Sequence, residues 1–308
     1  MEKTIYIIGA GAIGKTLAVV LKLEGRDVVL LRGSVDDGSR SIETIEILLE
    51  GKAPLVADVV VDTLSHYDTL EGIIVLTNKS YGNEQLARTL RAKTGSSPLV
   101  ILQNGLGVEQ VFIDTGYPEV YRCVLFTTSQ TISASQVRYK PVSVSPIGLV
   151  KGHDATLRRL VDTLNTDTIP FRADDTIQQT IWRKAILNSA FNSICPLLEA
   201  DNGVFHRNET ALGMARQVIA EGVAVARGKG VVLEETSLED TLLQLSRYSD
   251  GQLISTYQDI LHKRPTEIET LNIEIVRVAE TQGMHDQVPV IRLLGELTRL
   301  KSTLVLKA

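Results

Sequence analysis

The sequence predicts an α/β fold class, with a Rossmann-type doubly wound N-terminal domain plus an all-helical C-terminal domain. In the first half, short runs of valine, isoleucine and leucine alternate with helical runs, and continuous apolar strands are typical of a parallel sheet covered on both faces. In the second half, helical periodicity continues and prolines become sparse. We therefore expect two domains, residues 1–170 and 171–308, with the chemistry in the cleft between them.

Length, charge and cysteine count exclude several classes of protein. With 308 residues and a formal net charge of −5, the chain is long enough for two domains and lacks the basic stripe that a nucleic-acid partner requires. No apolar run reaches the roughly 18 residues of a membrane span. No signal-peptide pattern precedes the first strand, so we expect a cytoplasmic protein without a membrane partner. The two cysteines lie in apolar segments and the five histidines are scattered, which predicts neither disulfides nor a metal site.

The elements of the N-terminal domain are expected from its apolar runs. The strands are expected at Thr4–Ile8, Asp27–Leu31, Val56–Val61, Gly72–Thr77 and Leu99–Gln103, and the helices at Ala12–Leu23, Asn83–Arg91 and Ala155–Leu164. Between residues 120 and 150, polar and apolar residues alternate. This alternation predicts antiparallel strands added at one edge of the sheet.

The C-terminal domain is expected to contain only helices. They are expected at Thr176–Leu198, Glu209–Lys229, Leu238–Leu245, Thr266–Gln282 and Val290–Leu300. Pro265 suits the first position of the fourth helix, and Glu267 would lie in its first turn, where a carboxylate is favoured. The pattern alone therefore explains Glu267 equally well by helix stabilisation and by ligand binding.

A dinucleotide-binding turn is expected directly after the first strand. The turn reads Gly9, Ala10, Gly11, Ala12, Ile13 and Gly14, a G-x-G-x-x-G that opens a helix. Its glycines permit a tight turn and a close approach of the backbone to pyrophosphate, which the helix N-terminus then binds. A glycine-rich turn without a ligand would also fit the letters, but the order of strand, motif and helix favours the cofactor.

The tip of the second strand indicates which dinucleotide is bound. NAD sites usually carry Asp or Glu there for the ribose 2′-hydroxyl, whereas NADP sites offer arginine to a 2′-phosphate. The strand here ends in Arg32. We therefore expect NADPH/NADP as the cofactor, although a solvated surface arginine would give the same sequence.

Two further strand ends carry polar residues toward the edge of the sheet where ligands bind. Lys79 could neutralise a phosphate or a substrate carboxylate, and Asn104 could bond a ribose or the nicotinamide amide. Ordinary turn chemistry would also account for both, since Asn-Gly is a common turn pair.

One expected helix carries a polar stripe. Lys184, Asn188 and Asn192 are spaced four residues apart and therefore lie on one face. Asparagine is a poor helix former, so this stripe favours the lining of a cleft over a plain solvent-exposed face. Reduction of a ketone needs a proton donor and a positive field at the carbonyl oxygen. A lysine whose pKa falls from ~10.4 toward neutrality could supply both.

These motifs together resemble the ketopantoate reductase (2-dehydropantoate 2-reductase) family along essentially the whole chain. The matching pieces are GAGAIG with Arg32, Lys79, Gln103–Gly105, W-x-K-x-x-x-N-x-x-x-N from Trp182 to Asn192, Asn202-Gly203, Ser255-x-x-Gln258-Asp259, and Pro265–Ile268. The match is far more specific than a shared nucleotide-binding fold.

The resemblance implies NADPH-dependent reduction of a small 2-oxo acid, 2-dehydropantoate, to pantoate, a step toward pantothenate and coenzyme A. The general-acid lysine of the family matches Lys184. The substrate-binding residues match Asn188, Asn192, Asn202 and Ser255, and the residues that contact the cofactor or organise the complex match Lys79, Asn104 and Glu267. A homodimer formed through the helical domain is also an expectation from the family.

The sequence departs from the family pattern at several positions. Leu261-His262-Lys263 lacks the glycine that commonly precedes the arginine, and Ile273 replaces a usual glycine. The cofactor contact expected around Ser129–Thr131 has no clear match. These departures leave open a related 2-oxo acid as substrate. Two different functions also fit the nucleotide-binding motif: a β-hydroxyacid dehydrogenase, which shares the K-x-x-x-N helix, and a non-catalytic NADP(H)-sensing protein.

Overall fold

The computed structural model describes residues 3–33 and 35–307. It divides into two compact units. The first contains the chain up to Gln103 together with Val108–Ile177, and the second contains Asn104–Gly107 and the chain from Gln178 onward. The first unit extends beyond the expected boundary after residue 170 because strand Phe171–Ala173 pairs with Ser145–Lys151 of its sheet.

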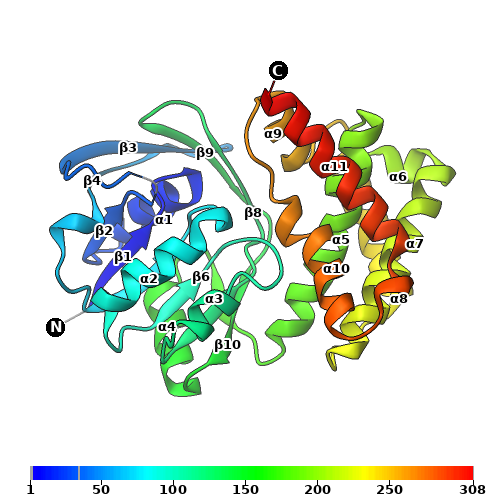
Figure 1. The fold of residues 1–308 in the computed structure, drawn as a ribbon. Helices are drawn as coiled ribbons and strands as arrows, with labels where there is room; N and C mark the ends of the chain where they lie inside the picture. Colours follow the sequence, from blue (N-terminus) through cyan, green and yellow to red (C-terminus); the bar gives the residue numbers. More distant parts are fainter. Residues whose placement is uncertain (1–2, 34, 308) are drawn as a thin grey trace. The chain divides into compact units, whose positions relative to one another are not determined.

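The first unit is built on one sheet (Figure 1). Its strands are β1 Thr4–Ile8, β2 Val28–Leu31, β3 Ser41–Leu49, β4 Leu55–Asp62, β5 Gly72–Leu76, β6 Leu99–Ile101, β7 Val120–Cys123, β8 Thr127–Thr131, β9 Gln136–Pro141, β10 Ser145–Lys151 and β11 Phe171–Ala173. Their order across the sheet is β11-β10-β7-β6-β5-β1-β2-β4-β3-β9-β8. Because β1 pairs in parallel with both β2 and β5, the chain is wound in both directions from β1. This is the doubly wound arrangement predicted from the sequence.

The segment from 120 to 150 does form strands, but the prediction that they lie at one edge is wrong. β7 runs parallel to β6, and β10 pairs with β7 in the antiparallel sense. The β8–β9 hairpin instead joins the other end of the sheet, where β9 runs parallel to β3. The prediction missed β3, in which Ile45 and Ile47 are buried and the other residues are half-buried or exposed. This strand pairs antiparallel with β4 on one side and parallel with β9 on the other.

Helices cover both faces of this sheet, as the buried strands require. Helices α1 (Ala12–Leu23) and α4 (Asp154–Leu164) pack on one face, and α2 (Asn83–Thr94) and α3 (Gln110–Asp114) pack on the other. Leu17 of α1 and Leu90 of α2 are almost completely buried, which stabilises each layer by roughly 1.5–3 kcal/mol per side chain.

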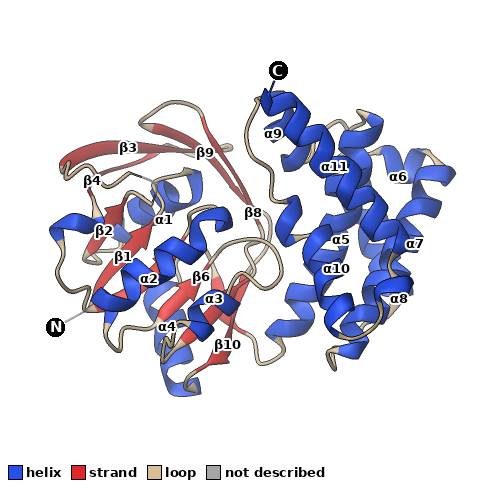
Figure 2. Cartoon of the chain, in the orientation of Figure 1, coloured by secondary structure: helices blue, strands red, loops and turns tan. Residues whose placement is uncertain are grey.

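The second unit is helical (Figure 2). Its helices are α5 Ile177–Leu198, α6 Val204–Arg207, α7 Glu209–Gly228, α8 Glu235–Tyr248, α9 Ser255–Leu261, α10 Asn272–Thr281 and α11 Pro289–Lys307. In helix α5, every residue from Ala185 to Pro196 except the half-buried Asn188 is buried, which is typical of a central helix. Gly222 allows α7 to pack closely against α5, because a Cβ at this position would lie 2.8 Å from Cγ1 of Ile186 on α5.

The expected helix Thr266–Gln282 is not continuous. A 3₁₀ turn, Ile268–Thr270, comes first, and α10 begins only at Asn272. Between them Leu271 has φ −114° and ψ −104°, which is incompatible with an uninterrupted helix. Glu267 therefore precedes a 3₁₀ turn instead of lying in the first turn of an α-helix, so the dipole explanation for its presence does not hold.

Candidate functional site

The glycine turn of the first unit is fixed by backbone packing. Gly9 has φ +119°, and a Cβ there would lie 2.5 Å from the backbone nitrogen of Asn78. A Cβ on Gly14 would lie 1.9 Å from the carbonyl oxygen of Gly9. No side chain larger than hydrogen fits at either position, so the close helix–strand contact explains two of the three glycines.

Gly11, the remaining glycine of the motif, leaves space for a ligand. Gly11 is the N-cap of α1, and no atom of residues 3–33 or 35–307 lies within 4 Å of the position that its Cβ would take. No described side chain caps this helix, and its first turn contains no acidic residue. The N–H groups of the first turn and the positive end of the helix dipole are therefore suited to an anion such as pyrophosphate.

The end of β5 is joined to the glycine turn. Thr77 donates its hydroxyl to the carbonyl oxygen of Gly9 at 2.9 Å, a link that was not predicted from the sequence. Next to it, Oδ1 of Asn78 is buried and has no hydrogen-bond partner within the described residues. Lys79 follows and is exposed. Polar groups of two strand ends thus meet at the turn, as expected for the ligand edge of the sheet.

Arg32 lies directly after β2 in a hydrogen-bonded cluster. Its Nη1 donates to the carbonyl oxygen of Ser39 at 3.2 Å and to the Ser39 hydroxyl at 2.5 Å. Its Nη2 lies 3.3 Å from Oε1 of Glu43 on β3. The guanidinium is therefore held at the strand tip and is only partly solvated.

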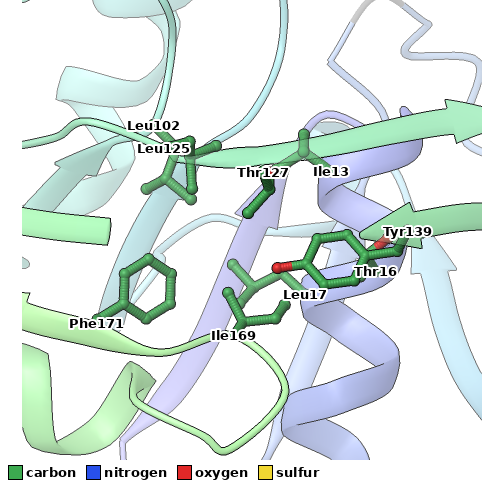
Figure 3. Close-up of a pocket in the computed structure, with 9 residues that line it drawn as sticks. All are labelled: Ile13, Thr16, Leu17, Leu102, Leu125, Thr127, Tyr139, Ile169 and Phe171. Atoms are coloured by element: carbon green, nitrogen blue, oxygen red, sulfur yellow. The ribbon is translucent and has the colours of Figure 1, made fainter. Parts of the chain in front are cut away.

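A small apolar pocket lies beside helix α1 (Figure 3). Its lining residues come from α1, from strand ends and from the β8–β9 hairpin: Ile13, Thr16, Leu17, Leu102, Leu125, Thr127, Tyr139, Ile169 and Phe171. Two of its hydroxyl groups, those of Thr127 and Tyr139, are buried without a hydrogen-bond partner among the described residues. Burial raises the pKa of Tyr139, so this phenol stays neutral at physiological pH.

Helix α5 of the second unit carries the predicted polar stripe. Lys184 and Asn188 are half-buried, and Asn192 is buried. The ammonium of Lys184 donates a hydrogen bond to Oδ1 of Asn104 at 3.0 Å. The candidate proton donor and the strand-end amide belong to separate motifs, and they are direct hydrogen-bond partners.

The Gln103–Gly105 segment is fixed residue by residue. In the first unit the side-chain amides of Gln103 and Asn83 exchange hydrogen bonds of 2.8 and 2.9 Å. In the second unit Gly105, with φ +101°, packs so closely that its Cβ would lie 2.4 Å from Oγ1 of Thr270. The N–H of Leu106 donates to the carbonyl oxygen of Thr270 at 2.8 Å. The glycine at position 105 is therefore required for close docking onto the 3₁₀ turn, beyond ordinary turn chemistry.

Glu267 and the α5 stripe contact neighbouring elements of the second unit. The carbonyl oxygen of Glu267 accepts hydrogen bonds from the N–H and the hydroxyl of Thr270, so Glu267 begins the same 3₁₀ turn. Oδ1 of Asn192 accepts from the N–H of Thr256 at 3.2 Å and from the hydroxyl of Ser255 at 3.3 Å. Asn192 and Ser255 are thus brought together at the start of α9.

Asn202 is buried in a loop that a backbone hydrogen bond and two ion pairs hold in place. Its N–H donates to the carbonyl oxygen of Gln252 at 2.9 Å, and its Oδ1 is buried without a hydrogen-bond partner in the described part of the chain. Arg207 forms ion pairs with Asp201 and Asp250 around this loop. Burial would raise the pKa of Asp201, but hydrogen bonds from the Gly203 N–H and Arg207 hold it below its ordinary value. Arg207 was not predicted from the sequence, because it belongs to no motif.

The candidate residues thus form two groups. The glycine turn, Arg32 and Lys79 lie in the first unit; Asn104, Lys184, Asn188, Asn192, Asn202, Ser255 and Glu267 lie in the second. Within residues 3–33 and 35–307, no three His, Cys, Asp or Glu side chains are arranged to hold a metal ion. None of the helices formed by these residues has the length and apolar character needed to cross a membrane.

Both units match models of one protein family. The model for "Ketopantoate reductase PanE/ApbA" matches residues 5–145, and that for "Ketopantoate reductase PanE/ApbA C terminal" matches residues 176–302. The 2-dehydropantoate 2-reductase of Pyrococcus abyssi is 30% identical over 302 residues, which cover 97% of this chain and 98% of that protein. The chain belongs to the ketopantoate reductase family.

One more relative and two solved structures are similar to this chain over nearly its whole length. The 2-dehydropantoate 2-reductase of Pyrococcus horikoshii is 29% identical over 307 residues, covering 97% of this chain and 98% of that protein. A dimeric ketopantoate reductase from Staphylococcus aureus superposes with a TM-score of 0.81 at 23% identity, and D-mandelate dehydrogenase with NADH and anilino(oxo)acetate with a TM-score of 0.84 at 22% identity. Each match covers 98% of this chain and 99% of the matched chain. At these identities the two structures show the shared fold alone.

Proposed function

We propose that the protein reduces 2-dehydropantoate to pantoate with NADPH, and that Lys184 is the general acid. The observation that carries this proposal is the 3.0 Å hydrogen bond from Lys184 to Asn104. It joins a cationic proton donor to a motif residue within the unit that also contains the candidate substrate-binding asparagines. The names of the relatives from both Pyrococcus species support the choice of substrate.

The residues of the first unit fit a bound dinucleotide. The open space beside Gly11 and the uncapped N-terminus of α1 suit its pyrophosphate, and Arg32 at the tip of β2 suits a 2′-phosphate. By resemblance to the family, Lys79, Asn104 and Glu267 would make the remaining cofactor contacts. When bound, the reduced nicotinamide supplies the hydride.

Lys184 completes the reduction. As the carbonyl carbon gains a hydride, its oxygen becomes an alkoxide, and a proton from Nζ of Lys184 converts this oxygen to the hydroxyl of the product. Before it gives up that proton, the ammonium stabilises the developing negative charge. Asn104 orients Nζ, because its Oδ1 accepts a hydrogen bond from the ammonium and so fixes the direction of the lysine side chain.

The substrate is a hydroxylated 2-oxo acid, and we assign its polar groups to the asparagines and Ser255. A substrate hydroxyl could donate to Oδ1 of Asn202, which is buried and otherwise lacks a partner in the described structure. Asn188 is half-buried on the same face of α5 as Lys184 and is suited to bind the carboxylate beside the ketone. Asn192 would hold Ser255 in place through the hydrogen bond between them.

The decisive test is turnover. Purified protein is mixed with NADPH and a panel of 2-oxo acids that includes 2-dehydropantoate, and NADPH loss is followed by absorbance. We expect oxidation with 2-dehydropantoate, much faster with NADPH than with NADH. No turnover with any acid would exclude an enzyme of this kind and favour an NADP(H)-sensing protein. Preference for another 2-oxo acid would reject only the substrate. In a separate assay, NAD-linked oxidation of a β-hydroxyacid in place of this reduction would reject the proposed reaction and the proposed use of NADPH.

We also propose that the protein is a homodimer that associates through α11. Leu293, Leu297, Leu300 and Leu304 are all exposed and follow a 4-3-4 spacing, so they form one apolar stripe on this helix. The dimeric ketopantoate reductase from Staphylococcus aureus supports a second copy of the chain as the partner. Light scattering during size-exclusion chromatography should give a dimer mass, and Leu297→Glu should give the monomer. A wild-type monomer would reject the proposal.

A further inference from the structure

We propose that Glu43 weakens the selectivity of the cofactor site for a 2′-phosphate by competing for Arg32. This inference rests on the proposed use of NADPH, and it adds a residue that no sequence motif contains. Glu43 is a positioning residue here, because it acts on the ligand through the guanidinium of Arg32.

The contact between the two side chains is direct. Nη2 of Arg32 lies 3.3 Å from Oε1 of Glu43, and the side chains are 24% and 34% exposed. The hydroxyl of Ser41 donates to the same oxygen at 3.2 Å, which helps to fix the carboxylate. The pair is thus only partly screened by solvent, so removal of the carboxylate changes the potential felt by a nearby anion.

A second carboxylate lies on the other side of the guanidinium. Nη1 of Arg32 donates to the hydroxyl of Ser39 at 2.5 Å, and that hydroxyl donates to Oδ1 of Asp37, also at 2.5 Å. Arg32 therefore has one acidic partner that it contacts directly and another that it reaches through a hydroxyl. Glu43 is the one that occupies a guanidinium N–H.

The position of Arg32 relative to the glycine turn makes this competition relevant to the cofactor. The N–H of Gly9 donates to the carbonyl oxygen of Leu31 at 2.8 Å, so the turn and the residue before Arg32 are adjacent. In a dinucleotide fold the adenosine ribose lies at this strand tip. A 2′-phosphate would bind best to both arms of the guanidinium, and Glu43 holds one of them. A ribose with a free 2′-hydroxyl has no phosphate to bind the guanidinium, so Glu43 should not affect its binding.

The experiment measures binding, so it does not depend on turnover. Wild type, Glu43→Gln and the control Glu50→Gln are titrated with NADPH and NADH by calorimetry, and with 2′,5′-ADP and 5′-ADP as fragments. Glu50 lies just beyond the other end of β3 and pairs with Lys140 at 3.0 Å, so its variant loses the same charge and also an ion pair.

We expect Glu43→Gln to bind NADPH and 2′,5′-ADP about fivefold more tightly, the equivalent of about 1 kcal/mol for a partly exposed pair. NADH and 5′-ADP should bind with unchanged affinity, and Glu50→Gln should bind all four ligands like wild type. The gain should shrink at high ionic strength. In an Arg32→Gln background, Glu43→Gln should have no effect, because the effect requires the guanidinium.

The outcomes separate this inference from the proposed function. If wild type prefers NADPH but Glu43→Gln binds it equally or less tightly, competition by Glu43 is rejected and NADPH use stands. A gain that persists in the Arg32→Gln background also rejects it. If neither protein prefers the phosphorylated ligands, both the inference and the proposed use of NADPH are wrong.

Discussion

The ammonium of Lys184 and the amide oxygen of Asn104 are hydrogen-bonded at 3.0 Å although 80 positions separate them in the chain. Lys184 lies on a long apolar helix, whereas Asn104 follows a strand of the sheet and belongs to the helical unit. A neutral acceptor orients the ammonium without adding a charge, which is suited to a proton donor whose acidity matters.

Removal of the proposed proton donor should abolish most turnover. Lys184→Ala is expected to lower kcat by about 10²-fold or more, since general-acid catalysis contributes roughly 10²–10⁴-fold in enzymes. Steady-state rates of NADPH oxidation with 2-dehydropantoate measure this effect. Arg183→Ala is the matched control, because it removes a neighbouring cation that bonds Ser237 instead. Equal losses in both variants would contradict the role of Lys184.

The partner of Lys184 should set the pH range of activity. Asn104→Asp keeps the shape of the side chain and places a carboxylate at the acceptor position. An adjacent negative charge favours the protonated ammonium, so the alkaline limb of the kcat profile should move to higher pH. The full pH profile of kcat for wild type and variant is the measurement. An unshifted limb would mean that the group titrating there is not Lys184.

A side chain at position 105 should lower the free energy of unfolding for two reasons. Its φ of +101° disfavours any residue but glycine, and a Cβ would lie 2.4 Å from Oγ1 of Thr270. Gly25→Ala isolates the effect of the backbone conformation, because Gly25 has φ +77° and no described atom lies within 4 Å of its Cβ position. Chemical denaturation should show a loss of about 1 kcal/mol for Gly25→Ala. Gly105→Ala should lose more than this and also reduce turnover; equal losses would refute the tight docking.

Asp62 should stabilise the first unit in a pH-dependent manner. Its carboxylate is buried and accepts hydrogen bonds from the Thr63 N–H, His66 and Tyr67. Burial alone would raise the pKa of Asp62, but these bonds outweigh it and hold the pKa below its ordinary value. The stabilisation is complete above the unfolded pKa of ~3.9 and is lost as the pH falls through the lower folded pKa.

Asp62→Asn should therefore lower the free energy of unfolding by about 1–3 kcal/mol at neutral pH, as expected for loss of buried charged hydrogen bonds. Urea denaturation at neutral pH and at a series of acidic pH values measures the difference. This difference should narrow as the medium becomes acidic. A difference that stays constant down to the lowest pH would show that the charge of Asp62 contributes nothing.

The hydroxyl of Tyr139 should be dispensable for stability. It is buried in the pocket beside α1 without a hydrogen-bond partner in the described structure, so Tyr139→Phe should raise the free energy of unfolding by about 1 kcal/mol or leave it unchanged. Tyr121 is the control, since its hydroxyl donates to the carbonyl oxygen of His153 at 3.1 Å. Tyr121→Phe should destabilise by about 1 kcal/mol. Equal destabilisation of both would indicate a partner for the Tyr139 hydroxyl.

Local patterns in the sequence predicted much of the fold. Strand β1 and helix α1 have the expected bounds, because an apolar run, a glycine turn and helical periodicity follow one another without ambiguity. Strand β3 was missed, and the strands between residues 120 and 150 were expected together at one edge, whereas β7 and β10 lie toward one end of the sheet and the β8–β9 hairpin forms the other. Alternation identifies a strand, but the choice of neighbour depends on long-range pairing that local periodicity does not encode.

The same distinction applies to the site. The stripe of Lys184, Asn188 and Asn192 could be predicted because helical spacing places such residues on one face. Neither the Lys184–Asn104 bond nor the Arg32–Glu43 pair could be predicted, since each joins residues on different elements. The contacts that orient Lys184 and that pair Arg32 with a carboxylate could therefore be identified only in the structure.

The assignment of Asn104–Gly107 to the helical unit means that the polypeptide passes between the two units three times, after Gln103, after Gly107 and after Ile177. A single cut therefore cannot separate the two units, because residues 104–107 of the second unit lie between two segments of the first. A fragment that starts at Gln178 would retain Lys184 but would lack its amide acceptor and the four-residue insert that docks on Thr270. The second unit therefore consists of two segments that are far apart in the sequence. A recombinant form of this unit would need residues 104–107 joined to the helical segment through a new linker.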